Sequence, residues 1–268
     1  MPKYAVLSDI HGNLEAFEAV LGVCSSMNVD KFILLGDIVG YNADPVRCIE
    51  LARSLDVVAA VRGNHDDYAI NYDPDNKAGF NPHAHLAIQW THDQLSDSDR
   101  EWLNSLEYSK QILKIKLTIV HATLDTPERW GYIFKADDCV SHFMEQKTLL
   151  SFCGHSHVPV AFVRLPDRST VELIPEWGGG IFDEDMDVDF SVIDSVTVQM
   201  KTMHNYLFNI GSIGQPRNGD PRASFAIYDS DELTVTRMMV PYDIAAAKQK
   251  VLDAGLPERL AIRLGIGH

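Results

Sequence analysis

The sequence predicts an α/β fold (α+β in some schemes) in which helices flank two mixed β-sheets, as a four-layer α-β-β-α sandwich. In the first half of the chain short apolar runs alternate with helical patterns, whereas β-rich runs dominate the second half. Helix-linked strands in both halves fit two facing sheets with helices outside better than two independent domains. No linker-like stretch separates the halves, so we expect one domain over residues 1–268, including C-terminal helices from about residue 243.

The first half opens with a β-α-β pattern that is then repeated. Apolar runs rich in β-branched residues predict the strands, and apolar residues at helical spacing predict the helices. Pro45 suits the first turn of a helix, where its missing N–H leaves no bond unmade. The predicted strands are 4–8, 32–35 and 57–61, and the predicted helices are 14–27, 45–53, 82–95 and 97–106. Each strand ends in polar residues, and ligands gather beyond the carboxyl ends of strands in such sheets.

The second half is predicted to be mostly β-structure. Residues 111–120 suit one or two strands, and a helix over 137–145 precedes strands at 149–153, 159–165, 170–174, 188–193, 196–203, 206–210, 223–228 and 233–240. Two short helices follow; we expect them to pack on the sheets rather than contact substrate, and they could support a homo-oligomer. The acidic segment 183–189 lacks the glycine and the terminal glutamate of a calcium loop, so we expect a solvated loop.

Composition and charge exclude several classes of protein. Hydrophobic residues make up 46% of the 268 residues and charged residues 23%, which is typical of a globular protein. No stretch approaches the roughly 20 apolar residues of a membrane helix, and the start lacks the apolar core of a signal peptide. The net charge of -15 disfavours long nucleic acids, which bind through Lys and Arg contacts to phosphate. Widely separated cysteines indicate reduced thiols and a cytoplasmic location: Cys24, Cys48, Cys139 and Cys153.

Five short motifs fall at or just after predicted strands: Asp9-Ile10-His11, Gly36-Asp37, Gly63-Asn64-His65-Asp66, His121 and Gly154-His155-Ser156-His157. Alternate residues of an extended strand point to the same side, so the paired residues of the first and last motifs are expected to point to one centre. Imidazole, carboxylate and amide ligands without cysteine are typical of a catalytic site for manganese, iron or zinc. The glycines either permit tight turns or let the backbone approach a crowded metal centre, and both interpretations can hold.

A site with two metal ions would need a bridging anion. Two dications about 3.5 to 4 Å apart repel each other by on the order of 20 kcal/mol, even at an effective dielectric constant near 20. Asp37, the lone carboxylate after a strand-ending glycine, is the candidate bridge. A metal-bridging hydroxide would be the second bridge and also the nucleophile.

These motifs and their order resemble the calcineurin-like metallophosphoesterase superfamily over essentially the whole chain. Within it, Asn81-Pro82, Trp90-Thr91 and the segment 209–217 look like a bacterial and archaeal branch labelled phosphodiesterase or diadenosine-tetraphosphatase-like. The resemblance implies two divalent metal ions, with manganese or iron ranked first and zinc or nickel as alternatives. In the implied ligand sets, Asp9, His11 and His157 bind one metal, Asn64, His121 and His155 bind the other, and Asp37 bridges.

The resemblance also implies that His65 contacts the substrate phosphate and helps protonate the leaving oxygen rather than binding metal. Protein serine/threonine phosphatases have a second acidic residue near the position of Gly40, so the usual partner of His65 is missing here. Asp66 is expected to point elsewhere, which leaves a water-assisted acid role open. Arg217 lies in a loop bounded by glycine and proline. It either binds a phosphate through two N–H groups of its planar guanidinium or is a surface arginine.

The sequence therefore predicts a dinuclear metal-dependent hydrolase of phosphomonoester, phosphodiester or nucleotide phosphoanhydride bonds, with small nucleotides as first-ranked substrates. The alternative is a non-catalytic interaction module with the same fold, although such proteins lose ligands or the catalytic histidine and this chain keeps them. A nuclease of the same chemistry would want a basic groove, which the net charge of -15 disfavours. Five of the six other histidines are interpreted as structural, with the first as a candidate extra ligand: His83, His85, His92, His142 and His204.

Overall fold

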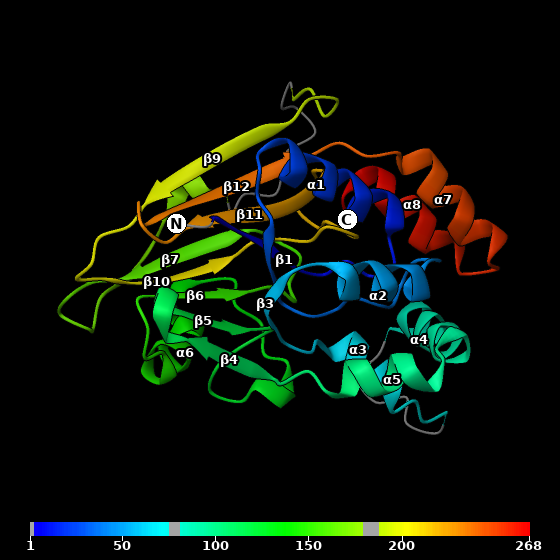
Figure 1. Cartoon of the computed structure of the whole chain (residues 1–268), viewed down its shortest axis with the longest axis horizontal. Helices are drawn as coiled ribbons and strands as arrows, with labels where there is room; N and C mark the ends of the chain where they lie inside the picture. Colours follow the sequence, from blue (N-terminus) through cyan, green and yellow to red (C-terminus); the bar gives the residue numbers. More distant parts are fainter. Residues whose placement is uncertain (1–2, 75–80, 179–187) are drawn as a thin grey trace.

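The computed structural model describes residues 3–74, 81–178 and 188–268 and contains two six-stranded sheets (Figure 1). The first sheet has the order β3 (Val57–Ala60), β2 (Lys31–Leu34), β1 (Lys3–Leu7), β11 (Ala223–Asp229), β12 (Thr234–Val240), β9 (Asp194–Gln199). The second has the order β4 (Ser109–Ile112), β5 (Leu117–Val120), β6 (Leu150–Cys153), β10 (Asn205–Asn209), β7 (Val160–Arg164), β8 (Val171–Leu173). Both sheets contain parallel and antiparallel pairs, which confirms the predicted mixed sheets.

Each sheet contains a block of parallel strands whose carboxyl ends lie at one edge. Strands β1, β2 and β3 are parallel neighbours in the first sheet, and β5, β6 and β10 are parallel neighbours in the second. Strand β11 lies antiparallel beside β1, so that the late strands β11, β12 and β9 extend the sheet that the first residues begin. Loops from both halves of the chain can therefore meet at the carboxyl ends of the parallel strands.

An apolar core lies between the two sheets. Tyr4 and Val6 of β1 pack with Phe152 of the second sheet, whereas Ala5 and Leu7 pack with the helices. Successive side chains of a strand point to opposite faces, so an apolar β1 contributes to both cores. One face of β1 is therefore covered by helices and the other by the second sheet.

Helices cover both outer faces. On the side of the first sheet, α1 (Leu14–Ser26) contacts β11 and β12. The apolar cluster around α1 also includes residues of α2 (Pro45–Ser54), α3 (Asn64–Ile70), α4 (Pro82–Gln94) and α5 (Asp97–Asn104). The second sheet is covered by the short helix α6 (Val140–Glu145) and the turn before it, through Phe143 and Cys139. The predicted four-layer sandwich is therefore confirmed, with a thinner outer layer on the second sheet.

Helices α7 (Ile244–Asp253) and α8 (Glu258–Ile266) do not pack on the sheets as the sequence predicts. Helix α7 contacts α1, and Leu260 and Leu264 of α8 share an apolar cluster with Ala84 and Ala87 of α4. The apolar sides of these helices therefore cover other helices, at the end of the molecule where α4 lies (Figure 1).

Two local predictions also differ from the structure. The predicted strand over 188–193 is a turn, because the Asp189 carboxylate accepts hydrogen bonds from the N–H and the hydroxyl of Ser191. Helix α3 was not predicted, since its sequence NHDDYAI is short and polar. None of the described helices is long and apolar enough to span a lipid bilayer.

Candidate metal centre

The predicted metal ligands lie just beyond the carboxyl ends of the parallel strands. The segments after β1, β2, β3, β5 and β6 supply, in this order, Asp9 and His11, Asp37, Asn64, His121, and His155 and His157. They form two buried groups whose ligand atoms lie within 4.8 Å of one another: Asp9, His11, Asp37 and His157, and Asp37, His121 and His155. Asn64 adjoins the second group, since its Oδ1 is 3.2 Å from His121 Nε2. Asp37 belongs to both groups, as a bridging ligand must.

Left-handed backbone conformations, not strand alternation, bring the paired ligands together. Strands β1 and β6 have already ended where Asp9 (φ 53°), His11 (φ 51°), His155 (φ 68°) and His157 (φ 61°) turn into the site. The predicted convergence is therefore correct, but the predicted cause is wrong. Such conformations cost on the order of 1 to 3 kcal/mol each and persist where the surrounding structure enforces them, as at functional sites.

Two of the motif glycines are required by close contacts with ligands. A Cβ on Gly63 would lie 2.1 Å from Asp37 Oδ1, and a Cβ on Gly154 would lie 2.3 Å from Asp9 Oδ2. Gly36 has a positive φ of 92° as well, and its Cβ would lie 2.4 Å from the nitrogen of Gly63. Both interpretations of these glycines hold, since close approach applies to all three and turn geometry to Gly36.

Backbone carbonyls fix the orientation and the tautomer of three imidazoles. Nδ1 of His11, His121 and His157 lies 3.0, 2.8 and 2.6 Å from the carbonyl oxygens of Val39, Leu35 and Gln215, respectively. A carbonyl oxygen only accepts, so each Nδ1 donates, and each Nε2 carries a lone pair when its ring is neutral. This support is typical of histidines that bind metal.

The ligand lone pairs face one another at short distance, and this arrangement fits divalent metal ions. Nε2 of His11 and Nε2 of His157 are 3.0 Å apart although neither can donate to the other. Asp37 Oδ2 lies 3.3 Å from Nε2 of His121. Asp37 Oδ2 and His155 Nε2 are buried and have no hydrogen bond among the described residues. Buried polar atoms without partners are unfavourable, and a cation between them would remove that cost.

Burial keeps most of these imidazoles neutral, as metal binding requires. Burial lowers the pKa of His155 to about 3 and holds the pKa of His11 well below its usual value. For His121, burial also disfavours the charged form, but the neighbouring Asp37 carboxylate outweighs it and raises the pKa to about 9. A metal ion on His121 therefore has to displace a proton.

His65 lies at the start of α3 beside the first ligand group, where Gly40 leaves room for its ring. A Cβ on Gly40, which has a φ of 96°, would lie 2.4 Å from His65 Nδ1. An acidic side chain at this position would thus collide with the ring where it now lies. Tyr41 packs on the ring instead, with the two ring centroids 4.3 Å apart. Burial lowers the pKa of His65 to about 4, so the imidazole is neutral at pH 7.

Asp66 organises the loop that carries the shared aspartate. Its carboxylate accepts hydrogen bonds from the N–H groups of Asp37 (2.8 Å), Ile38 (2.8 Å), Val39 (3.2 Å) and Gly63 (3.0 Å). These bonds satisfy backbone donors that are buried at the end of β2 and at the start of α3. Asp66 is therefore a positioning residue for Asp37, in line with its expected orientation.

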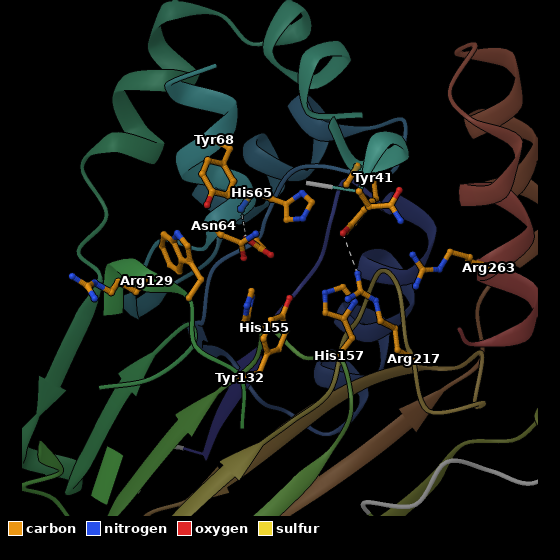
Figure 2. Close-up of a pocket in the computed structure, with 14 residues that line it drawn as sticks. Tyr41, Asn64, His65, Tyr68, Arg129, Tyr132, His155, His157, Arg217 and Arg263 are labelled. Carbon is orange, nitrogen blue, oxygen red and sulfur yellow. Dashed lines mark hydrogen bonds between the residues drawn. The ribbon is translucent and has the colours of Figure 1, made fainter. Parts of the chain in front are cut away.

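A cavity of about 410 Å³ lies over both ligand groups, and Arg217 lines it (Figure 2). Arg217 Nη2 donates to the hydroxyl of Tyr41 (3.1 Å) and to Gln215 Oε1 (2.9 Å). Its guanidinium is half-buried and lies 5.6 Å from the centroid of the Tyr41 ring. Arg217 is thus part of the cavity wall.

Other residues of the cavity belong to none of the sequence motifs: Tyr41, Arg129, Trp130, Tyr132 and Arg263. Tyr132 stacks on His155, with ring centroids 4.3 Å apart and an angle of 25° between the ring planes. Tyr132 and Arg129 lie on one side of the cavity and Arg217 and Arg263 on the other (Figure 2). The aromatic run WGYIF at 130–134 is a sequence signal for the first side, whereas Arg263 has none.

The histidines outside the motifs stay apart from the two ligand groups. His83 lies on α4 and lines a neighbouring cavity, so the described residues give no support to its role as an extra ligand. Nε2 of His142 lies 2.6 Å from the Ser151 hydroxyl, and Nδ1 of His92 lies 2.8 Å from the Ala69 carbonyl oxygen. The prediction of a solvated acidic loop falls mostly on residues 183–187, which lie outside the described residues.

Comparisons with known proteins agree with this geometry. Residues 3–233 match the model of the calcineurin-like phosphoesterase superfamily domain. An uncharacterized protein of Methanocaldococcus jannaschii is 36% identical over 266 residues, which cover 98% of each chain. The crystal structure of a metallophosphoesterase from Sphaerobacter thermophilus is similar with a TM-score of 0.78 and 33% identity, over 100% of this chain and 99% of that one. A hypothetical protein from Pyrococcus horikoshii shares the fold, with a TM-score of 0.74, 20% identity and coverage of 100% and 99%. The chain therefore belongs to the calcineurin-like phosphoesterase superfamily.

Proposed function

We propose that this protein is a dinuclear metal-dependent phosphoesterase. The observation that carries the proposal is the position of Asp37, which is shared by two buried groups of converging ligand atoms. The donors are imidazole, carboxylate and amide groups, which suit manganese or iron, with zinc or nickel as alternatives.

The proposed roles follow from the two groups. Asp9, His11 and His157 would hold one ion, Asn64, His121 and His155 the other, and Asp37 both. When bound, the two ions would activate a water molecule for in-line attack and neutralise charge on the phosphate oxygens. The carbonyls that accept from the histidine Nδ1 groups would keep the rings aligned during the reaction.

His65 and Arg217 would act on the substrate from the cavity walls. Both residues line the cavity together with the shared aspartate. We propose that the imidazole N–H of His65 donates a hydrogen bond to the phosphate or to the leaving oxygen. We also propose that Arg217 binds a phosphate through two N–H groups of its planar guanidinium. Neither role requires a covalent bond between the protein and the substrate.

The family implies a phosphorylated substrate, and we propose a small one that carries an aromatic group, with nucleotides ranked first. Trp130 and Tyr132 provide an aromatic wall beside His155, and Tyr132 stays 52% exposed and available for stacking. The net charge of -15 repels long polyanions, whereas the three arginines of the cavity attract small ones.

Hydrolysis assays test this proposal. We expect manganese-dependent release of nitrophenolate from nitrophenyl phosphate or bis-nitrophenyl phosphate, and release of nucleotide from diadenosine tetraphosphate if anhydrides are accepted. The relative rates rank monoesters, diesters and anhydrides as substrates. Absence of turnover on all three with each of the four candidate metals would contradict the proposal.

The His65→Ala variant tests the role of His65. If its N–H stabilises the leaving oxygen, kcat/KM for phenyl phosphate should fall by about 100-fold or more, and that for nitrophenyl phosphate should fall less, because nitrophenolate needs little protonation. Metal content should stay unchanged. Equal losses on both substrates would assign His65 to phosphate positioning instead. His204→Ala, just before β10 and outside the cavity, is the matched control.

We also propose that residues 1–268 form one domain. Strands β11 and β12, from the end of the chain, lie in the same sheet as β1, β2 and β3. Helix α8 contributes Arg263 to the same cavity as His65 and Asp37. Helix α8 is thus part of the proposed site rather than an appendage.

A further inference from the structure

Two arginines from distant parts of the chain reach the same wall of the cavity. Arg217 follows β10, whereas Arg263 lies on α8, beyond the residues 3–233 that match the superfamily domain. Arg263 extends from its helix toward Arg217 (Figure 2). Burial lowers the pKa of Arg263, and the positive charge of Arg217 lowers it further, as expected for neighbouring cations. The two guanidinium groups therefore both contribute positive charge to the same wall of the cavity.

The surrounding residues hold both guanidinium groups in place. Arg217 donates to Tyr41 and Gln215, and Arg263 donates from Nε to the carbonyl of His268. Tyr41 belongs to the apolar cluster that anchors α8 through Leu260. One tyrosine thus contacts Arg217 and also packs in the cluster that positions the helix of Arg263, so the pair is preorganised.

Neither guanidinium pairs with an Asp or Glu side chain in the part of the chain that the structure describes. Some other arginines of the chain do have such a partner, for example Arg62 with Asp67 and Arg222 with Asp220. Two neighbouring cations repel each other, and an anion from outside would relieve that repulsion.

Arg263 also lines a part of the cavity that contains none of the metal ligands. A small cavity adjoins the main one; it shares Tyr41, Asn81, Ala84 and Arg263 with it and is lined by none of the metal ligands. Arg263 therefore lies where the main cavity leads away from the metal centre. An anion bound to Arg263 would therefore lie next to the phosphate that the metals bind and would be a separate group.

We propose that Arg217 and Arg263 form a second anion subsite that binds the phosphate adjacent to the scissile one. The pocket would then prefer small molecules with two or more linked phosphate groups, such as nucleoside diphosphates and triphosphates, over simple monophosphates. Arginine suits this task because its planar fork matches the oxygens of phosphate. The inference rests on the proposed phosphoesterase function, and it assigns a substrate class to that site.

Calorimetric titration of the metal-loaded protein with inorganic phosphate and with tripolyphosphate tests the subsite. Wild-type protein should bind tripolyphosphate at least about tenfold more tightly than phosphate, since hydrogen bonds to charged groups are worth that much. Arg263→Ala should lose about tenfold in tripolyphosphate affinity and keep its phosphate affinity, and Arg263→Lys should lose less. Tripolyphosphate chelates metal in the same way with all variants, so a difference in its affinity between variants is due to the change at Arg263.

Arg47→Ala is the matched control, because Arg47 is an exposed helical arginine with a surface partner, Glu50. It removes the same charge and should leave both affinities unchanged. Equal binding of the two anions by wild-type protein, or equal effects of Arg263→Ala and Arg47→Ala, would overturn the subsite. The difference in affinity between variants tests the subsite, whereas absence of turnover on all three hydrolysis substrates with each of the four metals would refute the proposed function separately.

Discussion

Asp37→Asn should lower kcat/KM for nitrophenyl phosphate by at least about 100-fold, which exceeds the usual effect of losing a residue that only orients a ligand. Two dications need an anion between them, and asparagine supplies none. The metal content should fall from about two ions per chain toward one. The local fold should survive, because the asparagine oxygen can still accept the N–H of His65, as Asp37 Oδ1 does at 2.8 Å.

The Asp37→Asn experiment separates a bridging role from a general effect of charge. Circular dichroism should show an unchanged spectrum, and elemental analysis should show the loss of metal. Asp30→Asn, at an exposed position before β2, removes the same charge and should keep both metals and activity. Wild-type turnover by a fully metallated Asp37→Asn protein would refute Asp37 as the bridge.

Gly63→Ala should also disable the site, although it adds only one methyl group. The added Cβ would lie 2.1 Å from Asp37 Oδ1 and 2.4 Å from the Asp37 nitrogen, so the shared aspartate or the start of α3 must move. Overpacking of this kind costs about 1 to 3 kcal/mol of stability. Activity should fall by about 100-fold or more, since a displacement near 1 Å suffices for such a loss.

Gly22→Ala is the matched control for this substitution. Gly22 lies within α1, and a Cβ there would meet nothing within 4 Å. Alanine has the higher helix propensity, so the variant should gain up to about 1 kcal/mol in the free energy of unfolding and keep full activity. Thermal unfolding and nitrophenyl phosphate hydrolysis measure both effects. If Gly63→Ala retained two metals and normal kcat/KM, the close-contact argument would be wrong.

The sequence predicts most of the sandwich and all residues of the two ligand groups. Hydrophobic periodicity locates β1, α1 and β2 to within one residue at either end. The family resemblance implies that Asp37 is shared by two sets of ligands, and the structure brings Asp37 and the histidines of both sets together. These features could be predicted because they depend on local pattern and on the general rule that ligands follow the carboxyl ends of strands.

Features that depend on tertiary packing could not be predicted. The positive φ of Asp9 and His155 is enforced by the loops packed around them, and no local propensity signals it. Tyr41 and Arg263 meet at the cavity only because α8 folds back over α4. The amphipathic pattern of α8 reveals that one face is buried, but it does not reveal which surface covers that face.

Metal stoichiometry tests the central claim most directly. Purified protein would be stripped with chelator, reconstituted with manganese and measured by elemental analysis, alongside hydrolysis of bis-nitrophenyl phosphate. The account predicts about two ions per chain and turnover that disappears with the chelator and returns with the metal. A folded protein that binds at most one ion, or that hydrolyses the ester equally well after metal removal, would contradict it.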